Sequence, residues 1–328
     1  MKRYVLTGHT HPMMQLEECA APTPGKGEVL IDVKAASLNY RDLIVAKRDS
    51  GITPLSDGAG VIRALGEGVT EYQVGDRVVI GFMPGWVEGE FSAAKQDTSL
   101  GGGEVNGVLA EQIVVNASGV TPIPDSMSFE DAATLPCAAV TAWSALFERR
   151  SLQPGETVLL LGTGGVSIFA LQLAKIAGAK VIITSSSDEK LERARKLGAD
   201  HLINYRHNPD WADDVLRLTQ GIGADLAVDV AGPATLNSTM KAVRHGGRIS
   251  LMGVLTGVEG NIDTVTILQK RITLQGIYVG SVAALKAVTQ TGIKPWVDEV
   301  FAFEDAERAW HSLEEKNHFG KLVIKIQK

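Results

Sequence analysis

A glycine-rich segment in the middle of the chain is the strongest candidate for chemistry. The apolar run 157–161 ends at Gly-Thr-Gly-Gly (162–165), and a helical pattern follows. A strand, a glycine turn and a helix start together cradle a pyrophosphate, because the turn lets the backbone approach and the helix N-terminus offers unpaired N–H groups. Ser167 replaces the third glycine of the G-x-G-x-x-G fingerprint, and its hydroxyl could add a donor. The segment predicts a dinucleotide site, the alternative being a turn that needs glycine only to bend. The predicted contacts come from Gly162, Gly164, Gly165 and Val166.

The residues after the next predicted strand indicate which dinucleotide binds. An NAD site usually carries Asp or Glu about 20 residues after the glycine turn, where the carboxylate bonds the ribose hydroxyls. Here the strand ends in three serines, 185–187, which leave room for a 2′-phosphate. Lys190 could reach the same phosphate, unless it is an ordinary solvated helix residue. Asp188 and Glu189 are expected to complement the helix dipole instead. The pattern favours NADP, bound as NADPH, with Ser185, Ser186 and Lys190 in the site.

The surrounding elements divide the chain into a mostly β part and an alternating part. Strand patterns in the first part lie at 29–35, 58–65, 75–80 and 109–115, and 84–108 is expected to be a long loop. Helix and strand patterns then alternate, which predicts a doubly wound parallel sheet. Its further strands are expected at 158–161, 181–184, 225–230, 248–252 and 272–276.

Helix signals complete this outline. Ser128 resembles an N-cap with Asp131 three residues on, and the helix that it starts is expected to break near Pro136 and resume at 141–149. Further helices are predicted at 165–177, 189–197 and 304–313, and a last strand at 321–326.

Composition excludes some classes of function. The formal net charge is −6, which argues against a nucleic-acid partner because such binding usually needs a basic surface. No apolar run is long enough to span a membrane, and the N-terminus lacks the apolar region of a signal peptide. The two cysteines form no C-x-x-C pair, so a cytoplasmic location is expected.

Taken in order, several segments resemble the medium-chain dehydrogenase/reductase superfamily, in its zinc-independent branch of quinone oxidoreductase-like and alcohol dehydrogenase-like proteins. The resemblance covers nearly the whole chain. It implies an α/β fold, with a GroES-like, mostly β catalytic domain at 1–125 and 283–328 and a doubly wound Rossmann domain at 126–282. It also implies that Ser186, Lys190 and Tyr205 surround the 2′-phosphate. The segments that carry it are 36–42, 55–60, 74–78, 133–138, the turn at 162 and 196–205.

Departures from the zinc-dependent branch predict that no metal binds. Zinc alcohol dehydrogenases place a cysteine where this chain has Asn39, and a His-Glu pair where it has Ser56-Asp57. Cys137 alone matches a ligand position, and one thiol cannot hold a catalytic zinc, which takes about three protein ligands. Cys137 is therefore interpreted as a small buried hydrophobic residue.

Without a metal, a conjugated acceptor is the easier substrate. Hydride added to an enone or a quinone leaves a negative charge that spreads over an enolate or phenolate, and the protein then needs a hydrogen-bond donor and a proton source. Asn39 and Tyr40 lie where the resembling family has its substrate pocket. Asn39 is the expected donor, and Tyr40 is either the proton source or a packed aromatic. Asp42 is expected to tether the turn.

The nicotinamide end should be held at the carboxyl ends of two later strands, where ligands bind in open α/β sheets. Gly253 and Val254 follow one strand, and Tyr278 and Val279 follow the other, with Thr141 as a further contact. Each of these positions could instead be plain loop or helix structure. The resemblance also implies a homodimer that pairs through the edge strand near 264–276.

Three functions are compatible with these patterns. The leading hypothesis is an NADPH-dependent, zinc-independent reductase of an enone, quinone or other conjugated carbonyl. The second is an NAD(P)-dependent alcohol or carbonyl oxidoreductase that relies on side chains alone. The third is a low-turnover structural or RNA-binding relative of the fold, which the acidic charge disfavours.

Overall fold

The computed structural model describes residues 1–8 and 12–326. The chain forms two compact units, of which one joins Met1–Val140 to Val279–Lys328 and the other is Thr141–Tyr278. The sequence placed the boundaries at 125 and 282, so the two divisions differ over 126–140 and 279–282. The difference arises because the helix at Phe129–Ala132 packs on strands β3 and β4, which belong to the first unit.

A seven-stranded sheet and a two-stranded ribbon build the first unit. The order in the larger sheet is β14-β15-β3-β4-β5-β7, and β6 also pairs with β3. All of its pairs are antiparallel except β14 with β15. The predicted strands in this part are confirmed, although the one at 109–115 begins later. The strands are β1 (Lys2–Leu6), β2 (Met14–Glu18), β3 (Glu28–Ser37), β4 (Asp57–Leu65), β5 (Arg77–Ile80), β6 (Gln112–Asn116), β7 (Val120–Pro122), β14 (Val297–Ala302) and β15 (Lys321–Lys325).

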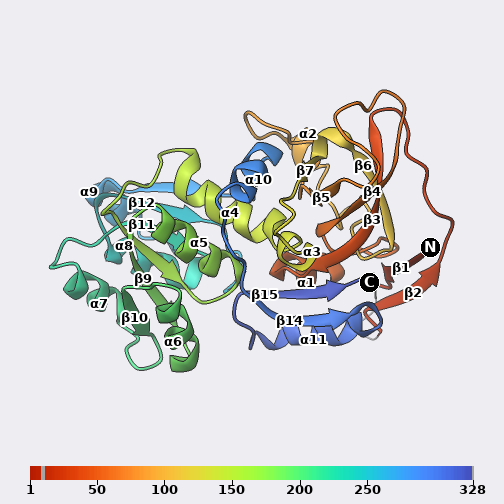
Figure 1. Ribbon diagram of the computed structural model, residues 1–328. Coiled ribbons are helices and arrows are strands. Elements are labelled where there is room, and N and C mark those ends of the chain that lie inside the picture. Colours follow the sequence, from red (N-terminus) through yellow and green to blue (C-terminus); the bar gives the residue numbers. More distant parts are fainter. Residues whose placement is uncertain (9–11, 327–328) are drawn as a thin grey trace. The chain divides into compact units, whose positions relative to one another are not determined.

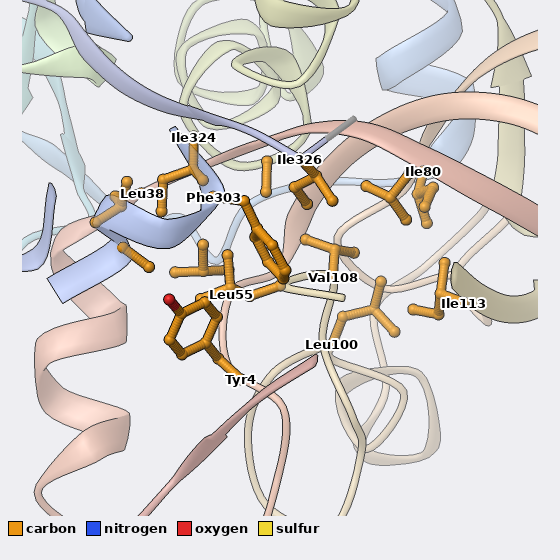
Figure 2. Packing of buried hydrophobic residues seen from close by; sticks show 14 of the residues in the cluster. Tyr4, Leu38, Leu55, Ile80, Leu100, Val108, Ile113, Phe303, Ile324 and Ile326 are labelled. Atoms are coloured by element: carbon orange, nitrogen blue, oxygen red, sulfur yellow. The ribbon is translucent and has the colours of Figure 1, made fainter. Parts of the chain in front are cut away.

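The C-terminal segment completes the core of this unit. Figure 1 shows β15 in blue beside β3 in red, and the two pair through Val323 and Ser37 at one end. In the core, the rings of Tyr4 and Phe303 meet edge to face at 5.1 Å between centroids. Figure 2 shows these rings together with aliphatic side chains from both ends of the chain. Residues near 300–326 are therefore required for the first unit to bury its apolar surface.

The helices of the first unit are short. Asn39 is the N-cap of α1, and the predicted Ser128 cap is confirmed, since its hydroxyl accepts from the Asp131 N–H at 3.0 Å. The predicted break near Pro136 is present at residues 133–134. Helical structure resumes earlier than predicted, at Leu135, and runs to Glu148, because a proline in the first turn needs no N–H partner. The predicted loop 84–108 contains a short helix, α2. The helices of this unit are α1 (Tyr40–Ala46), α2 (Ala93–Gln96), η1 (Ala117–Gly119), α3 (Phe129–Ala132), η2 (Leu135–Ala139), α10 (Val282–Thr289), η4 (Phe303–Asp305) and α11 (Ala306–Glu315). The helical segment that starts with η2 continues past Val140 into the second unit as α4 (Val140–Trp143) and η3 (Ser144–Glu148).

The second unit is a six-stranded parallel sheet with the order β10-β9-β8-β11-β12-β13. In chain order these are strands three, two, one, four, five and six of the unit, which is the Rossmann arrangement. The predicted α/β fold class is confirmed. The strands are β8 (Thr157–Leu161), β9 (Lys180–Ser185), β10 (His201–Asn204), β11 (Ala224–Asp229), β12 (Val243–Leu251) and β13 (Thr273–Gly276).

Helices connect the strands of this sheet. The predicted helix at 165–177 is α5, whose N-terminus follows β8 directly, and the one at 189–197 is α6. From β8, the chain builds the sheet outward in one direction to β10 and then in the opposite direction from β11 to β13. The carboxyl ends of β8 and β11 therefore form the topological switch point where ligands bind in such sheets. The helices are α5 (Gly165–Ile176), α6 (Asp188–Lys196), α7 (Trp211–Leu218), α8 (Pro233–Ala242) and α9 (Thr264–Lys270).

Candidate functional site

The turn after β8 has the geometry that a pyrophosphate site needs. Gly162 adopts φ +78°, a left-handed conformation that favours glycine, and its N–H donates to the Thr184 carbonyl at 2.9 Å. Gly164 is the N-cap of α5, and a Cβ built on it meets no atom within 4 Å. Gly165 and Val166 begin the helix, so their N–H groups have no partner in the preceding turn. The space beside Gly164 and the helix N-terminus fit a dinucleotide phosphate.

Ser167 does not serve the phosphate as the sequence suggested. Its side chain is buried, and its hydroxyl donates to the Leu161 carbonyl at 2.7 Å. The hydroxyl therefore fastens the first turn of α5 to the end of β8. This explains why serine is tolerated where the fingerprint has glycine, since the position requires a small side chain for close helix–strand packing.

The carboxyl ends of β9 and β10 bring the residues predicted for the 2′-phosphate close together. The Tyr205 N–H donates to the Ser185 carbonyl at 3.1 Å, and 41% of Tyr205 is exposed. Ser187 caps α6 and accepts from the Lys190 N–H at 3.3 Å, which places Lys190 in the first turn after the strand. Ser186 is partly exposed between them. The four predicted residues, Ser185, Ser186, Lys190 and Tyr205, therefore lie at or just beyond the carboxyl ends of β9 and β10.

Asp188, the acidic residue nearest this strand end, is engaged elsewhere. Its carboxylate accepts from the Asn204 side-chain amide at 2.7 Å and lies 3.8 Å from the His207 ring. It thus takes part in a contact of α6 with the last residue of β10 and with His207 beyond that strand. A serine, Ser185, stands at the strand end, where an NAD site usually has a carboxylate.

The positions predicted to contact the nicotinamide differ in steric space, exposure and backbone conformation. Gly253 is required sterically, because a Cβ there would lie 1.4 Å from the Val230 carbonyl oxygen. Val254 and Tyr278 are exposed after β12 and β13, while Val279 has φ +55°, a strained conformation for a β-branched residue. Thr141 is buried within α4. Their contacts with a cofactor remain a prediction.

In the first unit, Asn39 presents a buried amide with one unused end. Asn39 is 8% exposed, and its Oδ1 accepts from the Lys321 ammonium at 2.5 Å. Its Nδ2 is buried and has no hydrogen-bond partner among the residues that the structure describes. A buried donor without a partner costs about 1–3 kcal/mol, so it is usually retained for a ligand or a water. An unpartnered donor is therefore present at Asn39, and its role toward a substrate oxygen stays a prediction.

Lys321 is a candidate site residue that the sequence patterns did not indicate. It is 3% exposed, and its ammonium donates to the Leu38 carbonyl at 2.5 Å as well as to Asn39. Burial lowers the pKa of Lys321, and the nearby charge of Asp57 opposes that shift. In the sequence, Lys321 is a lysine at the start of an apolar strand. Because lysines are normally exposed, nothing in the neighbouring residues indicates that this one is buried.

The residues at the positions of the zinc ligands gather in the same region. Asp57 is fully buried, and it accepts from the Ser56 hydroxyl at 2.6 Å and from the Cys137 N–H at 2.9 Å. Although Cys137 as a residue keeps intermediate exposure, its sulfur lies deep enough that burial raises its pKa, and the charge of Asp57 raises it further. The thiol therefore stays protonated at neutral pH.

This donor set does not fit a zinc ion. Asn39 Oδ1 already accepts from an ammonium, and Asp57 is hydrogen-bonded at both oxygens. The charge of Lys321 would also repel a dication. Within residues 1–8 and 12–326, no group of three or more His, Cys, Asp or Glu side chains is arranged to hold a metal.

Tyr40 and Asp42 occupy the first turn of α1. Tyr40 is partly buried against the core of the unit, and the Lys316 ammonium lies 5.3 Å from the centre of its ring. Asp42 accepts from the Asn39 N–H at 2.7 Å, as a tether of the turn would. Burial raises the pKa of Asp42 to about 6, an effect that the adjacent Arg41 opposes. Asp42 thereby fixes the backbone of Asn39.

The fold and these sites define a class of protein, a nicotinamide-dinucleotide oxidoreductase with a Rossmann unit and a GroES-like unit. A family model described as alcohol dehydrogenase GroES-like domain matches residues 25–125, and one described as zinc-binding dehydrogenase matches 165–293. The chain belongs to the medium-chain dehydrogenase/reductase superfamily. It is an oxidoreductase of the alcohol dehydrogenase or quinone oxidoreductase type.

Three similar proteins illustrate the range of this family. A zinc-type alcohol dehydrogenase-like protein of Schizosaccharomyces pombe is 41% identical over 99% of both chains. A structure described as an NAD-dependent alcohol dehydrogenase is 34% identical, with a TM-score of 0.90 over the full length of both chains. A quinone oxidoreductase of Pseudomonas syringae is 26% identical, with a TM-score of 0.83 over 99% of both. In the described part of this chain, no helix has the length and apolarity needed to cross a membrane.

Proposed function

We propose that this protein is an NADPH-dependent reductase that transfers hydride to a conjugated carbonyl or quinone without a metal. The observation that carries the proposal is the unpartnered, buried Nδ2 of Asn39, in a region whose donor set does not suit zinc. A donor of this kind stabilises an oxygen that gains negative charge. A delocalised enolate or phenolate needs no stronger electrophile than that.

The proposed chemistry divides between the cofactor and the chain. Reduced nicotinamide supplies a hydride, which adds to the β-carbon of an enone or to a quinone. Asn39 donates to the oxygen that takes up the electron pair. The carbanion centre of the enolate, or the phenolate oxygen, then takes a proton from water or from Tyr40. Support for Tyr40 is limited to its place next to Asn39 in the chain, and its ring also packs against the core.

The preference for NADPH is part of the proposal. It is supported by the serines at the end of β9, by Lys190 in the following turn, and by the engagement of Asp188 with Asn204. The similar structure described as NAD-dependent shows that relatives with this fold also use the other cofactor. A direct comparison of the two cofactors is therefore part of the test.

The proposed function predicts a clear preference among acceptors. Cyclohexenone should be reduced with NADPH with a kcat/KM at least about tenfold higher than cyclohexanone, a difference of about 1.4 kcal/mol in the barrier. The two ketones have nearly the same size, so the comparison isolates conjugation. The measurement is the loss of NADPH absorbance under steady-state conditions, with a benzoquinone as a second conjugated acceptor.

A second function has support from the comparisons. Two of the similar proteins are named alcohol dehydrogenases or alcohol dehydrogenase-like, so oxidation of an alcohol or reduction of a simple carbonyl is the alternative. Faster reduction of cyclohexanone than of cyclohexenone, or faster oxidation of cyclohexanol, would favour that alternative and reject the conjugate-reduction proposal.

We further propose that the protein is a homodimer. Strand β13 stands at the end of the sheet order, and the neighbouring helix α9 carries Val265 and Leu268 with 58% and 76% exposure. An edge strand with adjacent apolar side chains is a surface that pairing with a second copy would cover. Light scattering at micromolar concentration should give twice the mass of one chain, and the mass of a monomer would contradict the proposal.

A further inference from the structure

The ammonium of Lys321 is held at a fixed position in the first unit. The Lys321 N–H donates to the Trp296 carbonyl at 3.0 Å, and Lys321 begins β15 opposite Val297 of β14. The preceding residue, Gly320, has φ +77°, and a Cβ on it would lie 2.5 Å from the same Trp296 oxygen. The backbone at Lys321 is therefore fixed by its pairing with β14 and by the close approach of Gly320 to Trp296.

Within residues 1–8 and 12–326, this ammonium donates to two neutral amide oxygens. They are the Leu38 carbonyl oxygen and Asn39 Oδ1, each at 2.5 Å from Nζ. The charged groups that act on Lys321 at longer range are Asp57, Asp42 and, when ionised, Cys137. The Asp57 carboxylate accepts hydrogen bonds from the Ser56 hydroxyl and the Cys137 N–H, and not from Lys321. The positive charge of Lys321 therefore acts most directly on the Asn39 amide.

The chemistry of lysine then fixes the orientation of the amide. An ammonium group has three donors and no acceptor, so only the oxygen end of the Asn39 amide can face it. The Nδ2 end must point the other way, and there it is buried without a partner in the described part of the chain. A hydrogen bond from a cation to Oδ1 also draws electrons from the amide, which makes the N–H groups on Nδ2 stronger donors.

We propose that Lys321 is a positioning residue for hydride transfer, which locks Asn39 with Nδ2 toward the substrate oxygen and strengthens that donor. The inference rests on the proposed role of Asn39. The positive charge of Lys321 thus acts on the substrate oxygen through the Asn39 amide. This occurs in the region where zinc-dependent relatives have their ligand positions. A lysine that only supported the Leu38 carbonyl would stabilise the fold and leave catalysis by Asn39 untouched.

A double-mutant cycle separates these roles. Lys321→Met removes the charge and keeps most of the apolar stem, and it is combined with Asn39→Ala. We expect Lys321→Met to lower kcat about tenfold or more in the wild-type background, and by less than about threefold when Asn39 is already alanine. Lys321→Arg should restore part of the activity. Affinity for NADPH, followed by fluorescence, should stay unchanged in all of these variants.

A matched control is available in the same strand. Lys325 is a half-exposed lysine of β15 that pairs with Glu130 at 3.0 Å. Lys325→Met removes the same charge from the same element and should leave kcat unchanged. Equal losses from Lys321→Met in both backgrounds, or full kcat in that variant, would overturn the positioning role.

A second variant keeps the test decisive if Lys321→Met does not fold. Asn39→Asp places a carboxylate of nearly the same shape against the ammonium, so it should melt at a higher temperature than Asn39→Ala while being equally slow. A lower melting temperature than Asn39→Ala would mean that no positive charge acts at this position, which overturns the inference.

The outcomes also separate this inference from the proposed function. Any carbonyl that accepts hydride develops charge on oxygen, so the cycle can be run with whichever substrate proves best. If Asn39→Ala is fully active, the proposed donor and the role of Lys321 both fail. If Asn39→Ala is slow and the Lys321 variants are not, the role of Lys321 alone fails.

Discussion

Replacing Asn39 with alanine is expected to lower kcat by about 10²–10³-fold, the usual effect of removing a well-placed donor to a developing oxyanion. The reason is that the Asn39 Nδ2 is buried and has no partner within residues 1–8 and 12–326, so its hydrogen bond is available to the transition state. Affinity for NADPH should change little, because the predicted cofactor contacts come from the glycine turn and the ends of later strands. Steady-state kinetics with cyclohexenone and a fluorescence titration of NADPH provide the two measurements.

Two controls accompany this prediction. Tyr40→Phe tests the proton source next to Asn39, and a small effect would leave Tyr40 with its packing role against the core. Thermal unfolding of Asn39→Ala shows whether the loss of activity comes from a loss of stability, because Asn39 is also the N-cap of α1. A stable Asn39→Ala variant with a kcat within about threefold of wild type would remove the donor from the mechanism.

Replacing Lys190 with alanine should weaken NADPH binding by about 1.5–3 kcal/mol, the range for a hydrogen bond to a charged group, and leave NADH binding nearly unchanged. This corresponds to roughly a 10- to 150-fold higher Kd. The physical basis is the place of Lys190 in the first turn of α6, beside a strand end that carries serines instead of an acid. The Kd of each cofactor is measured by titrating the wild-type and variant proteins into NADPH or NADH and following the fluorescence of the cofactor.

Lys196 provides a matched control for this prediction. It lies at the end of the same helix and is exposed, so Lys196→Ala removes an equal charge far from the strand end. That variant should bind both cofactors as wild type does. If Lys190→Ala weakened NADPH and NADH equally, Lys190 would be a residue that supports the site in general and not a reader of the 2′-phosphate.

Sequence alone determined the second unit in most of its parts, because the signals are local. The residues that form β8, the turn at Gly162 and α5 follow each other within about 20 positions, and apolar spacing distinguishes strands from helices at that range. The N-cap at Ser128 and the absence of an acid at the end of β9 were readable for the same reason. The helix resumes at Leu135 and not at Thr141 as predicted, because proline is accommodated in a first helical turn as readily as it ends a helix.

Tertiary structure alone decided the environment of Asn39. Lys321 lies 282 positions away in the chain, yet its ammonium orients the amide, and that contact exists because β15 pairs with β3. The destination of the Ser167 hydroxyl and the steric need for Gly253 were hidden in the same way. Residue types reveal which groups can donate or carry charge. The burial of a charge and the choice of its partner depend on which distant strands meet, and neighbouring residues do not encode that.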